Sequence, residues 1–462
     1  MMVSIRPLTI MLAFVLMLNT IAIPAQAQDE TATPDILLPG AFLGLRQALD
    51  IALQKHPIVQ EASATMKAAS ARTEQSKSLY YPQVYANVDS SAGAGRINPR
   101  FLIGGALLQP NLSAYTAGVI ANQRLYDFGF TRNLVESSKM AERAQEQAVQ
   151  AGRAIVAFNV QRSYYTSLKR KRLVDIAEQT VRERGVIKSQ IEALHRQQLK
   201  SKLDLDLVQV ELTNAQSLLV KAKNDLKAGY TDLNRVMGIV GSTDYVLEEL
   251  PVEVRPQRTL ETLITETLGH PEVRRARELI GAAEARVRAM KRQHLPTISA
   301  LASGGNYQTF DSSQNVPTGG WWAAAAMVSM PLFTGFMIEN QVREAAAQQS
   351  AAQAGSLDIE QALTQQVTTS YLDTVTLAQQ IKLGEEQVKT SQEALQLAKQ
   401  RYRLGLGSVV EVTQAEVAVT VAQTRLAEAQ YDYKIAEVTL AYAAGMTGLS
   451  ETAARIEPNG GH

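Results

Sequence analysis

The sequence predicts an α+β protein built from two copies of one helix–strand–strand–helix unit. The main observation is a ten-position apolar stripe that occurs twice. The later stripe consists of Val412, Ala415, Val419, Ala422, Leu426, Ala429, Tyr433, Ala436, Leu440 and Ala443. Subtracting 207 from each number gives Leu205, Val208, Leu212, Ala215, Leu219, Ala222, Leu226, Gly229, Leu233 and Val236. Steps of three and four residues are typical of a helix packed along its whole length, and the shared register indicates an internal duplication.

The duplication extends toward the N-terminus. Val160–Tyr164 aligns with Val367–Tyr371 at the same offset of 207, and His56-Pro57 aligns with His270-Pro271 at an offset of 214. The expected organisation is a signal peptide at 1–27, a first repeat at 28–238, a linker at 239–259, a second repeat at 260–446 and a disordered tail at 447–462.

Two segments, 131–196 and 338–403, contain no proline and predict long helices of 66 residues each. At roughly 1.5 Å per residue, each would be about 100 Å long. Turns are expected at 197–201 and 404–408. Proline disfavours the helical region for the residue before it and is favoured at the first helical position, so a new helix begins at Pro57. In each repeat the shorter helices, placed end to end, have about the length of one long helix. This predicts four helical columns of similar length lying side by side as a wall.

Strand pairs are expected at about 82–126 and 296–333. In the first strand, Val84, Ala86 and Val88 alternate with Tyr85, Asn87 and Asp89, which predicts one apolar and one polar face. Four strands cannot close a barrel, and an open sheet edge is not tolerated in lipid, so at least two chains must contribute; three would give twelve strands. The pairs Tyr80-Tyr81 and Trp321-Trp322 fit interfacial aromatic girdles, although strand packing would explain them too.

The N-terminus predicts export. Arg6, an apolar run from Leu8 to Ile23 and Ala25-Gln26-Ala27 are typical of a signal peptide with its cleavage site. Cysteine is absent, which excludes disulfides and a thiol nucleophile. The formal net charge of +1 gives no field to attract nucleic acid, so nucleic-acid binding is set aside.

No catalytic, cofactor or metal constellation emerges from the sequence. His56 and His270 precede proline at equivalent repeat positions, where a helix-break role is favoured over a ligand role. Serine and carboxylate groups lie on long predicted helices without the glycine-rich elbows that nucleophiles need. We therefore expect a protein that is not an enzyme.

The sequence resembles the TolC family of outer membrane efflux proteins. The resemblance rests on Ala25-Gln26-Ala27, the duplicated plan, Pro331–Gly335 after the fourth strand and Tyr402–Gly407 at the second helical turn. It implies a homotrimer in the bacterial outer membrane, with a twelve-stranded β-barrel in contact with lipid and a twelve-helix α-barrel extending through the periplasm.

The resemblance further implies a passive, gated exit duct for drugs or secreted protein. An inner-membrane pump, proton-driven or ATP-driven, and a periplasmic adaptor protein would be its partners. The residues implied to contact the adaptor are Arg403, Leu404, Gly405, Leu406, Gly407 and Ser408. The first copy has no glycine at its turn, Arg196–Ser201, so that turn is harder to predict.

The resemblance also implies a gate just past the second turn. Glu411 matches an acidic family position that faces the tunnel, while a second acidic position of the family is Gln414 in this chain. Tyr402 matches a residue that holds the tip shut, and its expected hydrogen-bond partner is Asp204. Gly407 replaces a family arginine, which removes one closing contact. Glu411 could otherwise be an ordinary solvated helix residue.

Two other classes of protein share some of these features. A trimeric adhesin also builds a twelve-stranded barrel on a coiled coil, but its strands form one C-terminal block. A periplasmic adaptor has a helical hairpin without duplicated strand pairs. A trimeric adhesin or a coiled-coil structural protein without transport is thus the alternative function, and channel conductance would discriminate.

Overall fold

A computed structural model describes residues 40–91, 101–103, 106–108, 114–241, 244–254, 258–309 and 319–446. The chain divides into two units, Met1–Pro39 and Gly40–His462, and all of the described residues belong to the second. The expected signal peptide and the expected tail lie outside the described residues. None of the described helices combines the length and the hydropathy needed to cross a bilayer.

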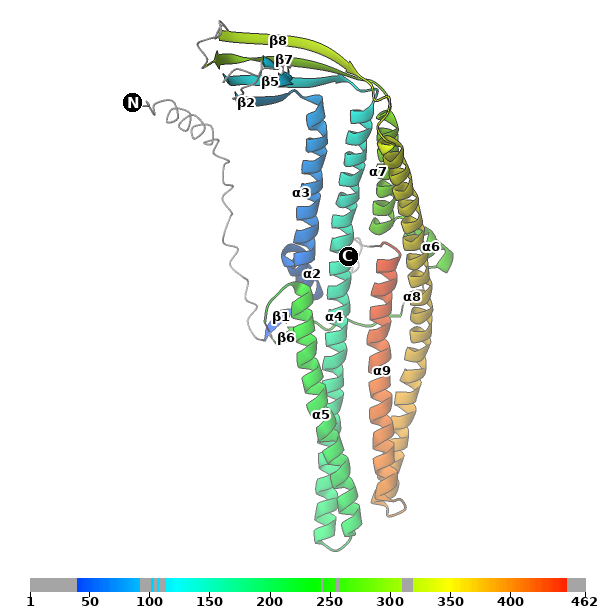
Figure 1. The fold of residues 1–462 in the computed structure, drawn as a ribbon. Helices are drawn as coiled ribbons and strands as arrows, with labels where there is room; N and C mark the ends of the chain where they lie inside the picture. The colour runs from blue at the N-terminus through cyan, green and yellow to red at the C-terminus, as the bar shows by residue number, and fades with distance from the viewer. Residues whose placement is uncertain are drawn as a thin grey trace, which may run out of the picture. The chain divides into compact units, whose positions relative to one another are not determined.

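Four long helices form two hairpins (Figure 1). Helix α4 (Phe130–Arg196) turns into α5 (Lys202–Met237), and α8 (Met337–Arg403) turns into α9 (Val409–Ala443). Helices α4 and α8 have 67 residues each, one more than the expected segments. The hairpins pack together through α4 and α9, and the apolar stripe of α9 is mostly buried, largely against α8 of the same hairpin.

Two shorter helices continue the hairpins toward the sheet. Helix α3 (Pro57–Lys77) follows α2 (Leu45–Lys55), and α7 (Pro271–Arg292) follows α6 (Leu260–Thr267). Figure 1 shows α3 above α5 and α7 above α9. This is the stacking that the summed helix lengths predict.

The two stacking joints are built in the same way. His56 and His270 cap α3 and α7, because the Nδ1 atom of each accepts the backbone N–H two residues later, at 3.2 and 3.1 Å. Gly238 (φ +74°) and Gly445 (φ +75°) end the opposing helices. A Cβ on either glycine would lie 3.1 Å from the Cα of the facing histidine. Only glycine allows both the backbone conformation and the close approach.

The sheet has the strand order β2-β5-β7-β8 and is antiparallel throughout. Its strands are β2 (Gln83–Ser91), β5 (Ala114–Tyr126), β7 (Thr297–Thr309) and β8 (Gly319–Ser329). The register places Val84, Ala121, Ala302 and Ala324 in one row across the sheet. Trp322 shares that face and is 83% exposed. The opposite face carries Tyr85, Ile120, Ser303 and Ala323 in one row. The first strand therefore alternates between two faces, but the second face of the sheet is mixed and not uniformly polar.

Four of the described strands, each of three residues, were not expected. Between the first two long strands, inside the expected strand pair at about 82–126, lies β3 (Phe101–Ile103), paired with β4 (Ala106–Leu108). The expected linker contains β6 (Tyr245–Leu247), paired in parallel with β1 (Ala41–Leu43). Strands of three residues give too short an alternation to recognise, and tertiary contacts hold β1 and β6 in place. The buried Tyr164 hydroxyl donates to the carbonyls of Leu43 and Glu248 at 2.9 and 3.2 Å.

The second joint should be sensitive to acid. The His270 side chain is 0% exposed, and burial lowers its pKa below the ordinary value. Protonation would also remove the Nδ1 acceptor of the cap. The unfolded chain binds this proton near pH 6.5 and the folded chain only at lower pH, so stability should fall below pH 6.5 by up to about 1.4 kcal/mol per pH unit.

His270→Asn keeps a side-chain cap that does not titrate, so it should remove part of the acid-induced loss of stability seen in thermal unfolding between pH 7 and pH 5. His56→Asn is the matched substitution at the less buried joint and should change the pH dependence less. An unchanged pH profile in His270→Asn would contradict the buried neutral cap.

Candidate functional site at the helical tips

The two helical turns have the same backbone. Gln198 (φ +61°) and Gly405 (φ +74°) occupy equivalent positions in the left-handed region. The N–H of Leu199 donates to the carbonyl of Leu194 at 2.9 Å, and that of Leu406 donates to Arg401 at 2.9 Å. This bond pattern is the Schellman ending of a helix. The first turn therefore forms without the glycine that its sequence lacks.

Each turn leads into a serine-capped helix. The Ser201 hydroxyl accepts the N–H of Asp204 at 3.1 Å, and the Asp204 carboxylate accepts the N–H of Ser201 at 3.2 Å. In the second copy the Ser408 hydroxyl accepts the N–H of Glu411 at 3.2 Å. A serine followed three residues later by an acid is the capping-box signature. The spacing of Ser201 to Asp204 and of Ser408 to Glu411 could therefore have indicated both helix caps from the sequence alone.

Glu411 lies at the surface of the second tip. Its side chain is 48% exposed, and one carboxylate oxygen lies 3.7 Å from Nε of Arg401. Arg401 also donates to the Leu406 carbonyl at 3.2 Å. A Cβ at Gly407 would lie 3.1 Å from the same Glu411 oxygen, so the absence of a side chain there makes room for the carboxylate. Gln414 is exposed one turn further along α9.

The expected bond from Tyr402 to Asp204 is wrong for the single chain. The Tyr402 hydroxyl is buried and has no hydrogen-bond partner among the residues described, and the Asp204 carboxylate is held by the cap of α5. The Tyr402 ring instead packs against the cluster of Ile191, Val208 and Val409, which joins both hairpins.

Lys200 lies in the expected first turn, but the sequence predicts no role for it at the tip. Its Nζ atom lies over the Tyr402 ring, 4.3 Å from the centroid, in cation–π geometry. The contact links the turn of the first hairpin to the end of α8. No pattern within either copy signals it, because Lys200 and Tyr402 come from non-equivalent repeat positions.

The ends of both turns expose leucine. Leu199 and Leu406, equivalent by the offset of 207, are 65% and 68% exposed, and Leu404 is 74% exposed. Arg403, Gly405 and Ser408 lie beside them. Exposed apolar side chains flanked by polar groups are typical of a surface that binds another protein.

A charged cluster lies above the tips in the seam between the hairpins. The buried Arg184 guanidinium of α4 lies 2.9 Å from the Glu211 carboxylate of α5. Glu416 of α9 is also buried, 3.2 Å from the Lys399 ammonium of α8, and burial raises its pKa while Lys399 opposes the rise. These pairs tie each helix to its hairpin partner at the level where α4 and α9 meet.

Long paired hairpins continued by a sheet with one apolar face define a component of a membrane duct. The family model described as "Outer membrane efflux protein" matches the chain twice, over residues 48–239 and 265–446. The chain therefore belongs to the outer membrane efflux protein family. It is an outer membrane channel protein of efflux systems and not an enzyme.

Relatives and solved structures agree with this assignment. The chain is 22% identical to outer membrane protein TolC of Salmonella enteritidis over 424 residues, covering 87% of this chain and 82% of that protein. It is 21% identical to the probable outer membrane lipoprotein SilC of Salmonella typhimurium over 406 residues, covering 85% and 84%. The outer-membrane channel OprN has the same fold, with a TM-score of 0.76 at 19% identity, covering 87% of this chain and 89% of OprN.

The first turn predicts a stabilising substitution. A non-glycine residue in the left-handed region destabilises the folded chain by roughly 1–2 kcal/mol. Glycine removes this strain, but it also gives the unfolded chain more conformational entropy, which offsets part of the gain. Gln198→Gly should therefore raise the free energy of unfolding by about 1 kcal/mol at most, measured by denaturant titration. Gln197→Gly, next to it at φ −87°, should lower that free energy. Equal effects would mean that Gln198 is not strained.

Proposed function

We propose that this chain is one third of a passive, gated exit duct that carries drugs or secreted protein from an inner-membrane pump, through the periplasm, to the exterior. The observation that carries the proposal is the continuity of the four-stranded sheet with helical columns about 100 Å long. A sheet of this kind would cross the outer membrane, and the columns would extend into the periplasm.

The unpaired edges support a homotrimer. Among the strands that the structure describes, β2 and β8 each have a neighbour on one side only. In lipid these edges must pair with another chain, and three copies would give twelve strands and a helical tunnel. Helix α5 supports the same arrangement, because Val210, Leu218 and Val220 are exposed on it in the single chain.

The tips support the proposed gate and adaptor contact. Three copies of the exposed Glu411 around a threefold axis would form a ring of carboxylates, and like charges so close would attract cations. Exposed leucines at the turn ends would offer apolar contacts to a periplasmic adaptor. Within this proposal the Lys200–Tyr402 contact would help to keep the tips together, in place of the expected Tyr402–Asp204 bond.

Recordings from the purified full-length protein in planar bilayers test the proposal. A duct should give discrete single-channel steps, whereas an adhesin or a structural coiled coil should give none. Substituting Leu404 or Leu406 with bulky polar residues should abolish export in cells while the bilayer conductance persists. Absence of any conductance would overturn the duct.

Glu411→Ala should weaken the block of the channel by multivalent cations, because the proposed ring would lose three carboxylates. Gln414→Ala, one turn away on the same helix, is the matched control and should leave the block unchanged. Cation selectivity and block in planar bilayers are the measurements. Identical block in wild type and Glu411→Ala would place the constriction elsewhere.

A further inference from the structure

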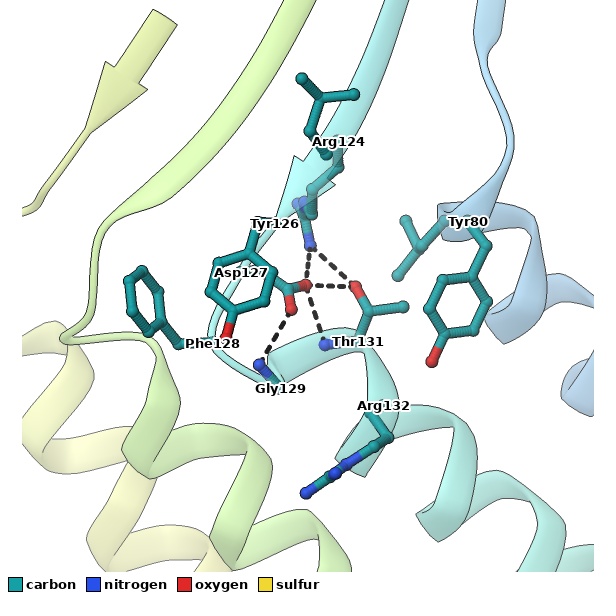
Figure 2. Close-up of a pocket in the computed structure, with 10 residues that line it drawn as sticks. Tyr80, Arg124, Tyr126, Asp127, Phe128, Gly129, Thr131 and Arg132 are labelled. Carbon is teal, nitrogen blue, oxygen red and sulfur yellow. Dashed lines mark hydrogen bonds and ion pairs between the residues drawn. The ribbon is translucent and has the colours of Figure 1, made fainter.

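A cavity of about 390 Å³ lies where the sheet meets the first long helix. It is lined by the end of β5, the turn into α4 and the short helix η1 (Ser78–Tyr80). Figure 2 shows the aromatic rings of Tyr80, Tyr126 and Phe128 around it, with Arg132 on the side of α4. The site combines aromatic walls with cationic groups.

The charges inside the cavity are largely neutralised. The Asp127 carboxylate accepts the N–H groups of Gly129 and Thr131 at 3.2 and 2.9 Å, which caps α4. It also lies 3.4 Å from Nη1 of Arg124. Burial alone would raise the pKa of Asp127, but these hydrogen bonds and Arg124 lower it, so the carboxylate stays ionised. Neither Arg124 nor the helix end is left to bind a ligand.

Arg132 is the cationic group that remains. Its side chain is exposed, and it forms no ion pair with any residue that the structure describes. With Arg124 and Asp127 paired, the cavity carries one uncompensated positive charge. A ligand with one negative charge would complement it.

The mouth of the cavity is continuous with the apolar face of the sheet. Tyr126 pairs with Ile298, which pairs with Val328, in a row on the same face as Val84 and Trp322. Tyr80 and Tyr126 are 50% and 55% exposed. Tyrosine combines an apolar ring with a hydroxyl group that can bind water, so it is typical of the lipid–water interface. The free guanidinium is therefore at the end of the surface that would face lipid.

We propose that this cavity binds an anionic phospholipid of the periplasmic leaflet, with the phosphate at Arg132 and the glycerol and first methylenes against Tyr80, Tyr126 and Phe128. The proposal rests on the proposed placement of the sheet in the outer membrane. A guanidinium suits phosphate because its N–H groups match the phosphate oxygens. The aromatic walls distinguish a lipid from free phosphate.

The second repeat supplies a natural comparison. Its turn has the same backbone, with Gly335 (φ +62°) and Phe336 (φ +65°) at the positions of Phe128 (φ +53°) and Gly129 (φ +91°). Its side chains differ. At the offset of 207, Glu339 stands at the position of Arg132. The second turn should therefore repel the lipid that the first one binds.

Native mass spectrometry of the full-length protein in non-ionic detergent tests the proposal, with phosphatidylglycerol and phosphatidylethanolamine of equal chain length as probes. Wild type should prefer phosphatidylglycerol by about fivefold, as expected of one partly exposed ion pair. Arg132→Gln should remove the preference. Glu339→Gln, the matched variant in the second copy, should keep it.

Equal binding of the two lipids by wild type, or an unchanged preference in Arg132→Gln, would overturn the proposal. Glycerol phosphate should compete poorly; if it displaced the lipid at equal concentration, the aromatic walls would have no role and the lipid assignment would be wrong. Thermal unfolding of Arg132→Gln should match wild type, because the side chain is exposed. These readouts are independent of conductance, so a failed duct and a failed lipid site give different results.

Discussion

The stacking of α3 on α5 and of α7 on α9 is the contact on which the architecture depends. Each pair of short helices acts as one column beside a continuous 67-residue helix. The two pieces of a column come from distant parts of the chain, so no covalent link aligns them. Alignment relies on a proline that starts one helix, a histidine that caps it and a left-handed glycine that ends the other. Helix α2 packs on both α4 and α5 near the first joint, and this supports it laterally.

The seam between the hairpins combines close packing with buried charge. Alanine at many stripe positions of α9 lets the neighbouring helices α8 and α4 approach closely, and the packed side chains gain dispersion contacts. Glu416 and Arg184 interrupt this apolar seam, and each is buried at a desolvation cost that its partner offsets. Replacing a buried ion pair by apolar residues is often neutral or stabilising. The contact between the hairpins is therefore less stable than an entirely apolar seam could be. In the proposed gated duct, a seam of that kind would suit helices that shift relative to one another.

The large elements could be predicted because their patterns are long, whereas contacts between elements could not. Sixty-six residues without proline favour a helix, and His56-Pro57 indicates a joint through local backbone chemistry. Strands β1 and β6 were missed because three residues carry no periodicity and their support from Tyr164 is more than a hundred residues away from β1 in the chain. At the tip, Lys200 and Tyr402 meet through the packing of two hairpins and not through spacing within one. The family resemblance gave Tyr402 a partner in Asp204, yet a nearby backbone N–H satisfies that carboxylate first.

The duplication preserved the backbone and let side chains diverge at the two ends of the molecule. Asp204 and Glu411 both follow a capping serine, but they differ by one methylene. The shorter aspartate folds back onto the N–H of Ser201, while the longer glutamate reaches toward Arg401 and keeps about half of its surface in water. Arg132 and Glu339 differ in sign on the same turn of backbone. A threefold assembly of such chains would have nearly sixfold walls but strictly threefold chemistry. Charges at the sheet end would alternate in sign around the axis, whereas the tips would carry acidic groups of one sign in two different settings. Within the proposed duct, one copy at each end would thus be available to bind or gate, while the other would close the wall.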